Sequence, residues 1–218
     1  MNYTVSEENY LKTIFHLQQV DDTVSTSQVA EAIQTKPASV TDMMKKLHTK
    51  KLLNYKRYHG FSLSAEGRRV AVGIIRRHRL WEYFLSEKLA FSWEEVHSIA
   101  EELEHVRNKK LIDRLDDFLG NPPFDPHGDP IPDSKGKMQP ADQICLTELP
   151  LNQKATISHV SGQSTALLET LAALHIRIGS TLEVRKRSTF DGSVQVKLHQ
   201  KLQFISLQVA QHLFVHKQ

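Results

Sequence analysis

The sequence comprises 218 residues, 39% of them hydrophobic and 24% charged, with a formal net charge of +3. This length suits one large domain or a few small ones, and the composition is ordinary for a soluble globular protein. The sequence shows neither an apolar run long enough to cross a bilayer nor a signal-peptide pattern at its N-terminus, so we expect a cytoplasmic protein with no membrane partner. The single cysteine, Cys145, excludes an intrachain disulfide and fits a reducing compartment.

Three helices are predicted near the N-terminus. The first follows an N-cap at Ser6 and ends near Val20. The second opens with a capping box at Ser25–Gln28, and the third has Pro37 at its first position and runs to about Lys50. Two short helices joined by a tight turn, the second of them basic, are typical of a helix-turn-helix.

A basic hairpin is predicted directly after these helices. Its strand candidates are Leu52–Tyr58 and Phe61–Leu63, with His59–Gly60 at the tip. The whole segment therefore predicts a winged helix-turn-helix whose third helix enters the major groove of double-stranded DNA.

Positive charge is concentrated in and after this segment. Between Lys36 and Arg79 there are twelve Lys or Arg against two acids, an excess that favours phosphate backbones. The residues predicted to face base edges are Lys36, Pro37, Ala38, Ser39, Thr41 and Asp42. Those predicted to contact phosphates are Lys45, Lys46, Lys56 and Arg57. Ser27 is a further DNA-contact candidate. A solvated surface is the alternative for the base-facing residues.

Three further helices are predicted after the hairpin. The fourth follows a cap at Ser64 and ends near Leu89, and a capping box at Ser92–Glu95 opens the fifth. The sixth runs from about Lys109 to Phe118. Their apolar faces exceed what one winged domain needs, so we expect a helical dimer interface.

Imidazole and carboxylate side chains recur at helical spacing in the fourth and fifth helices. They are His97, Glu101, Glu104 and His105 at i, i+4, i+7 and i+8 of the fifth helix, with His78 and Glu82 at i and i+4 upstream. Nitrogen and oxygen donors without thiolates suit a borderline divalent ion such as Mn2+, Fe2+, Co2+ or Zn2+. An ordinary solvated helix face is the alternative.

A proline-rich linker is predicted at Gly120–Pro140, which also contains Asp125 and His127 as either loop residues or further donors. Beyond it, the pattern predicts a small SH3-like β-barrel. Its strand candidates are Lys154–Val160, Thr181–Arg185 and Val194–Leu198, with one helix from Ser164 to Leu174 and a final segment at Phe204–Val215. The predicted fold class is a mainly α N-terminal part with this small β domain. Its predicted domains are a winged helix-turn-helix at 1–64, a helical metal-binding and dimerisation domain with the linker at 65–140, and the SH3-like domain at 141–218.

Several segments together resemble the diphtheria toxin repressor family of metal-dependent transcriptional regulators, and more closely its manganese-sensing branch. These segments are Asn9–Ile14, Pro37–Thr41, Tyr55–Leu63, Arg77–Glu82, Glu101–Val106 and Asp129–Pro132. The C-terminal part is similar to the SH3-like, ferrous transport accessory A-like module of the longer members. The resemblance implies a homodimeric repressor that binds palindromic operator DNA when loaded with Mn2+, or alternatively Fe2+, and controls metal-uptake genes.

The same resemblance implies a set of metal ligands. His78, Glu101, Glu104 and His105 match ligands of the family, Glu82 and His97 match ancillary ligands, and Asp125 and His127 resemble a Cys-Pro-His element of a second site. Glu101 stands where iron sensors have a cysteine, and a hard carboxylate there favours Mn2+.

Two positions near the N-terminus depart from the family pattern. Asn9 stands where manganese sensors have an aspartate, and its amide oxygen is a weaker ligand. Lys12 stands where one manganese branch has a second glutamate. For the ligand that longer members take from the SH3-like domain, Gln163 and Ser164 are the nearest polar candidates.

Two other functional classes remain open on the sequence. Glu102-Leu-Glu-His105 fits the Glu-x-x-His element of di-iron carboxylate enzymes, although those need two copies and further glutamates. A DNA-binding regulator without metal dependence would use the same donors as a polar seam between helices.

Overall fold

The computed structural model describes residues 3–93, 95–139, 142–162 and 164–217, so Pro140 at the end of the predicted linker and Gln163 lie outside it. The chain divides into two compact units, which we describe separately. The first comprises residues 1–78, 101–115 and 132–137, and the second 79–100, 116–131 and 138–218. Within the described ranges, no helix is both long and apolar enough to cross a membrane.

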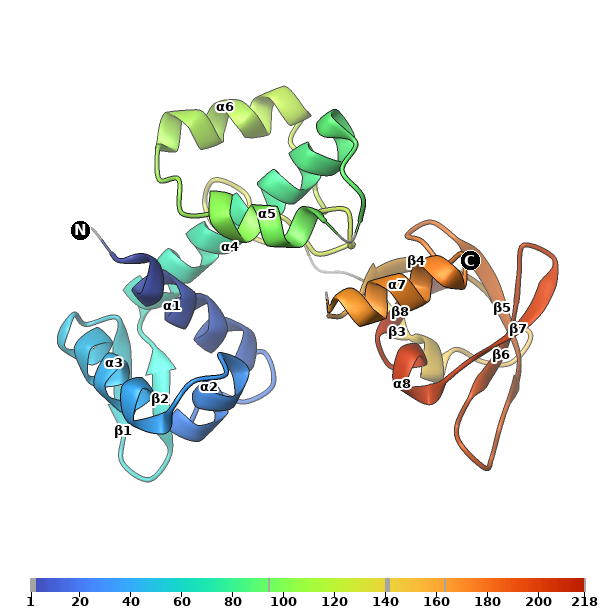
Figure 1. The fold of residues 1–218 in the computed structure, drawn as a ribbon, viewed down its shortest axis with the longest axis horizontal. Coiled ribbons are helices and arrows are strands. Elements are labelled where there is room, and N and C mark those ends of the chain that lie inside the picture. The colour runs from blue at the N-terminus through green and yellow to red at the C-terminus, as the bar shows by residue number, and fades with distance from the viewer. Residues whose placement is uncertain (1–2, 94, 140–141, 163, 218) are drawn as a thin grey trace. The chain divides into compact units, whose positions relative to one another are not determined.

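The first unit contains a winged helix-turn-helix (Figure 1), which confirms that prediction. Its elements are α1 (Val5–Leu17), α2 (Thr26–Ala32), α3 (Pro37–Thr49), β1 (Leu53–Lys56) and β2 (Gly60–Leu63). The two strands pair antiparallel with Leu53 opposite Leu63, and Val24 forms an isolated bridge to Phe61 at the edge of the wing.

Local hydrogen bonds explain where these helices begin. The predicted capping box of α2 is present, with the Ser25 hydroxyl accepting from the Gln28 N–H. The predicted Ser6 cap is wrong, because Thr4 caps α1 and exchanges two hydrogen bonds with Glu7 three positions later. Ser6 has Asn9 at the corresponding position, and a capping box requires Glu or Gln there.

Two predicted boundaries also differ. α1 ends at Leu17 rather than near Val20. The wing turns at residues 57–59, and Gly60 already opens β2. Gly60 has φ +100°, and a Cβ there would lie 2.4 Å from the Val24 carbonyl oxygen, so this position requires glycine.

A buried carboxylate joins α1 to α3. Glu7 has no exposed surface, and its Oε1 lies 3.0 Å from Lys46 Nζ and 2.6 Å from Lys50 Nζ. Burial alone would raise the pKa of Glu7, but the hydrogen bonds from Lys50, Thr4 and Lys46 outweigh it and lower the pKa from 4.5 to about 2. Ionised Glu7 therefore stabilises the packing of α1 against the third helix.

We expect Glu7→Gln to remove roughly 1–2 kcal/mol of stability at neutral pH, after allowance for the solvent exposure of both lysines. Because the folded pKa is depressed, this contribution is present above 4.5 and is lost as pH falls towards about 2. Urea unfolding followed by far-ultraviolet circular dichroism across this range measures it. Glu66→Gln, which breaks an exposed pair with Arg69, is the control and should change little; equal effects would contradict the burial argument.

Three helices follow the wing: α4 (Ala65–Leu89), α5 (Val96–Leu103) and α6 (Lys109–Leu119). The Ser64 hydroxyl accepts from the Gly67 N–H, which confirms the predicted cap of α4. The fifth helix is shorter than predicted, because Glu104 and His105 lie in a turn after Leu103. The Glu104 carbonyl instead accepts a hydrogen bond from the Arg77 guanidinium.

The C-terminal part of the second unit is a six-stranded antiparallel sheet in the order β3-β8-β4-β5-β6-β7 (Figure 1), and it confirms the predicted fold class. Its elements are β3 (Ile144–Cys145), a 3-10 turn (Leu146–Glu148), β4 (Lys154–Val160), α7 (Thr165–Ala173), β5 (Thr181–Arg187), β6 (Val194–Leu198), β7 (Lys201–Ile205), α8 (Leu207–Ala210) and β8 (Leu213–Lys217). Alternate residues of β6, namely Val194, Val196 and Leu198, enter one apolar core with Leu171 of α7.

The proline-rich segment before this sheet is ordered against β4. The His127 carbonyl accepts a hydrogen bond of 3.0 Å from the Val160 N–H. Gly128 has φ +85°, and a Cβ there would lie 1.9 Å from the Ser158 carbonyl oxygen. The backbone of the sheet thus determines the position of the loop that carries Asp125 and His127.

Candidate metal centre

Most of the predicted donors fall into two clusters of side chains. In the first unit, His78, Glu101 and Glu104 surround Lys12, and we call these four residues the Lys12 cluster. In the second unit, Glu82, His97, Asp125 and His127 lie together, and we call them the Glu82 cluster. The sequence predicted every donor in both clusters but did not predict that a lysine would lie among the first group.

Lys12 of α1 contacts both carboxylates of its cluster. Its Nζ lies 2.6 Å from Glu101 Oε1, 2.6 Å from Glu104 Oε2 and 3.5 Å from His78 Nδ1. His78 Nδ1 in turn lies 2.7 Å from Glu104 Oε2. The ammonium therefore lies within hydrogen-bonding reach of three of the predicted ligands.

Glu104 is fully buried within this cluster. Burial alone would raise the pKa of its carboxyl, but the hydrogen bond with His78 and the charge of Lys12 outweigh burial and hold the pKa below its ordinary value. The carboxylate is thus ionised, and its Oε2 is paired with protein groups, whereas its Oε1 lacks a hydrogen bond from the described residues.

The other two predicted ligands of this unit have different surroundings. His105 Nδ1 lies 2.6 Å from Glu8 Oε2, and its Nε2 is 3.9 Å from Glu104 Oε1. Asn9 has a buried Oδ1 that lacks a hydrogen-bond partner within the described part of the chain. Glu8, for which the sequence predicts no site role, is buried beside Arg77 and Arg107 at 3.2 and 3.1 Å.

The Glu82 cluster lies in the second unit and is buried. Glu82, Asp125 and His127 each offer a ligand atom within 4.8 Å of the others. Glu82 Oε1 lies 3.1 Å from His97 Nδ1 and 3.8 Å from His127 Nδ1. The cluster joins donors from α4, α5 and the proline-rich loop.

Backbone and aromatic contacts orient the two loop donors. Asp125 Oδ1 accepts hydrogen bonds from the N–H groups of His127 and Asp129 at 2.8 and 2.9 Å, whereas its Oδ2 lacks any hydrogen bond from the described residues. His127 Nε2 lies 3.3 Å from the Trp93 carbonyl oxygen, and its ring stacks on the Trp93 indole. A proton on Nε2 would leave a lone pair on Nδ1, the nitrogen nearer Glu82.

The electrostatics of this cluster favour a cation. Burial, and then the nearby charges of Glu82 and Asp129, raise the pKa of Asp125 well above its ordinary value, although Arg79 opposes this with Nε 3.7 Å away. Burial lowers the pKa of His127, which favours the neutral imidazole that metals bind. Two buried carboxylates and a neutral imidazole with an unsatisfied Nδ1 fit a divalent ion.

Arg79 and Asp129 support the loop and were not identified from the sequence. Arg79 donates to Asp129 Oδ1 at 2.8 Å and to the Pro130 carbonyl at 2.6 Å, and His159 Nε2 of β4 lies 3.6 Å from the same Asp129 oxygen. The Arg77–Glu82 and Asp129–Pro132 segments contained these residues, but only the tertiary structure shows that they meet.

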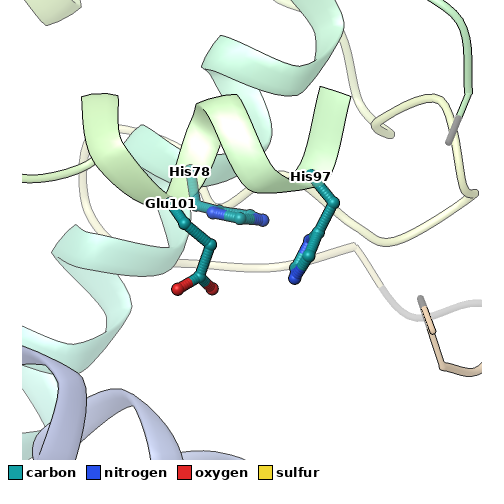
Figure 2. Close-up of side chains that lie close together, drawn as sticks. All are labelled: His78, His97 and Glu101. Carbon is teal, nitrogen blue, oxygen red and sulfur yellow. The ribbon is translucent and has the colours of Figure 1, made fainter. Parts of the chain in front are cut away.

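His97 and Glu101 lie one turn apart on α5. Figure 2 shows Glu101 close to His78 of α4, and these two residues offer ligand atoms within 4.8 Å of each other. The predicted helical spacing of His97 and Glu101 is therefore present, whereas Glu104 and His105 lie in the turn after α5.

The predicted DNA contacts lie mainly on the exposed surface of the winged helix-turn-helix, which we call the wing domain. Ser27, Lys36, Pro37, Ala38, Ser39, Asp42, Lys45, Lys46, Lys56 and Arg57 are exposed, and Thr41 is partly buried. Two of them already have partners, because the Thr41 hydroxyl donates to the Pro37 carbonyl and Lys46 contacts Glu7. In the C-terminal domain, the Ser164 hydroxyl caps α7.

Three family descriptions together match most of the chain. "Iron dependent repressor, N-terminal DNA binding domain" matches residues 2–61, "Iron dependent repressor, metal binding and dimerisation domain" matches 64–133, and "FeoA domain" matches 144–217. These descriptions agree in order with the wing domain, the helices that carry the donors and the C-terminal sheet.

Known proteins are similar over long stretches. The iron-dependent repressor IdeR of Mycobacterium bovis is 31% identical over 168 residues, 71% of this chain and 73% of that protein. The regulator MntR of Oceanobacillus iheyensis is 34% identical over 116 residues, 53% of this chain and 78% of that protein. A solved structure titled "Manganese-dependent transcriptional repressor complex with manganese" has a TM-score of 0.88 and 32% identity, and covers 97% of this chain and 100% of that one.

These likenesses decide between the functional classes that the sequence left open. The family consists of repressors rather than enzymes, so the di-iron enzyme alternative is wrong. With its winged DNA-binding domain, buried donor clusters and FeoA domain, the chain belongs to the iron-dependent repressor family of metal-dependent transcriptional regulators.

Proposed function

We propose that this chain is a Mn2+-dependent, homodimeric repressor of metal-uptake genes whose ion binds at the Glu82 cluster. The observation that carries the proposal is the pair of buried atoms without hydrogen bonds, Asp125 Oδ2 and His127 Nδ1, beside the Glu82 carboxylate. Buried polar atoms are rarely left unsatisfied, and a bound cation would satisfy both at once.

The donor types support Mn2+ as the ion. Carboxylate oxygens and imidazole nitrogens without a thiolate suit Mn2+, and they also accept Fe2+. The related MntR proteins and the manganese-bound solved structure favour Mn2+, whereas the IdeR relatives make Fe2+ the alternative. The two ions must therefore be compared directly.

An ion at this cluster would supply the positive charge that two buried carboxylates require. The protein contributes the orientation, because Trp93 and the backbone around Asp129 hold the loop donors before the ion arrives. If the DNA-bound form holds the ion more tightly, metal raises DNA affinity and DNA raises metal affinity by the same factor.

We assign the tasks of the protein to three segments. Residues 1–64 bind a palindromic operator, residues 65–140 bind metal and form the dimer, and residues 141–218 support the loop through β4. A protein that acts on chromosomal operators works in the cytoplasm, which is the location we expect.

Removal of a loop donor should abolish metal-dependent DNA binding. In fluorescence anisotropy with DNA from upstream of the source organism's manganese or iron transporter genes, we expect Asp125→Asn or His127→Ala to reduce the metal-induced gain in affinity by more than about tenfold. Asp191→Asn, in an exposed turn of the C-terminal sheet, is the control and should match the unmodified chain. Titrations with Mn2+, and with Fe2+ under anaerobic conditions, identify the better ion.

Removal of the metal with a chelator, while DNA binding is measured, tests the same proposal. Tight, sequence-specific binding that persists in excess chelator would replace it with a DNA-binding regulator that needs no metal. Loss of binding in chelator and its recovery with either ion would support the proposal.

The exposed lysines of the wing domain should act through phosphates. Lys45 of α3 and Lys56 of β1 are exposed, and we expect Lys45→Ala and Lys56→Ala each to reduce the slope of log affinity against log salt by about 0.9. The control is Lys217→Ala in β8, which should leave the slope unchanged. An unchanged slope in both wing variants would remove these residues from the interface.

Exposed apolar side chains mark a candidate dimer surface in the second unit. Leu89, Phe91 and Phe118 are 53%, 37% and 65% exposed, although large apolar side chains are usually buried. The family match describes the surrounding segment as a dimerisation domain. We therefore place the homodimer contact on these side chains.

We expect Phe118→Glu to convert the dimer into a monomer and to weaken operator binding, because a monomer contacts only one half-site. Light scattering after size-exclusion chromatography gives the mass of the assembly. Phe190→Glu is the matched control, since Phe190 is 99% exposed in a turn of the C-terminal sheet. A dimeric Phe118→Glu variant would place the interface elsewhere.

A further inference from the structure

We propose that the Lys12 ammonium group occupies the Lys12 cluster in place of a divalent ion. Each chain then holds a single metal ion, which binds at the Glu82 cluster. This inference rests on the proposed function and assigns its two donor clusters different roles. His78, Glu101 and Glu104 then act as partners of an ammonium group rather than as metal ligands.

The geometry of Lys12 supports this role. Lys12 Nζ donates to one oxygen of Glu101 and one oxygen of Glu104, and it lies 3.5 Å from His78 Nδ1, the nitrogen that is 2.7 Å from Glu104. Both carboxylate contacts are 2.6 Å, which is short even for charge-assisted hydrogen bonds. These contacts use the atoms that would bind an ion.

Burial makes the ammonium difficult to displace. The Lys12 side chain is only 14% exposed, and that of Glu104 is fully buried. A divalent ion at these oxygens would lie beside a positive charge, and the repulsion is strong where water is largely excluded. The ion could bind only if the lysine left, which would cost its hydrogen bonds.

The two clusters differ in the cations that contact their carboxylates. In the Glu82 cluster, Asp125 Oδ2 and His127 Nδ1 lack hydrogen bonds from the described residues, and Arg79 Nε is no closer than 3.7 Å to Asp125. In the Lys12 cluster, Glu104 Oε1 also lacks a hydrogen bond from the described residues, but the Lys12 ammonium contacts both carboxylates at 2.6 Å. The first arrangement fits an ion and the second does not.

Lys12 also holds two helices of the first unit together. It ties α1 to the end of α5 by ion pairs that need no metal. Occupancy of the Glu82 cluster would then be the single metal-dependent event in each chain.

Metal counting tests the inference. After equilibrium dialysis against Mn2+, we expect one ion in the unmodified chain and two in Lys12→Met, which nearly keeps the length of the side chain but removes its charge. Lys50→Met is the matched control, because it removes another lysine–glutamate pair of α1 without touching either cluster, and it should retain one ion.

Variants of the carboxylates locate the ion. In the otherwise unmodified chain, Glu104→Gln should retain the ion and Asp125→Asn should lose it. In Lys12→Met, Glu104→Gln should return the count from two ions to one. The pair of single variants also decides the question if Lys12→Met fails to fold, because neither removes the lysine.

Several outcomes would overturn the inference. Two ions in the unmodified chain, or one ion that is lost in Glu104→Gln and retained in Asp125→Asn, would show that Lys12 does not exclude the metal. In either case, metal-dependent DNA binding would still support the proposed repressor. DNA binding that is insensitive to chelator, with no ion bound, would instead refute the proposed function itself.

Discussion

Buried carboxylates occur in both units of this protein, and each of them needs a positively charged or hydrogen-bonding partner. Glu7, Glu8, Glu82, Glu104 and Asp125 are buried, and an uncompensated carboxylate is costly in a protein interior. Each has cationic or imidazole neighbours from other segments, so these ion pairs also determine which helices pack together. In the first unit, they join α1 to α3, to α4 and to the turn after α5.

The protein compensates these charges in two different ways. Lysine and arginine side chains contact Glu7, Glu8 and Glu104 directly, and these contacts need no bound ion. Asp125 is compensated only in part, since its nearest guanidinium nitrogen is 3.7 Å away and one of its oxygens has no hydrogen bond from the described residues. A regulator needs such an incomplete cluster, because only a site that gains stability from an ion can report its presence.

The C-terminal sheet contributes to this arrangement through its backbone. The hydrogen bond from Val160 to His127 and the close approach of Gly128 to Ser158 hold the loop on β4. Such contacts require only main-chain atoms and a glycine, so they leave no charged or polar signature in the sequence of the sheet. The backbone of the C-terminal sheet can thus determine where the two loop donors, Asp125 and His127, lie.

The sequence by itself determined the fold class and the winged helix-turn-helix, and it predicted the donor residues that lie together in the Lys12 and Glu82 clusters. Local rules were sufficient there: Pro37 opens α3, the Ser25 capping box opens α2, and alternating apolar residues define β6, because each signal depends on neighbours along the chain. Only the tertiary structure separated the donors into two clusters and placed Lys12 among one of them, since helical spacing cannot show which side chain arrives from a distant helix. The tertiary structure also shows that Glu7 and Glu8 are buried. The local sequence indicates only that they are acidic residues in the first turn of a helix, because burial depends on what packs against that helix.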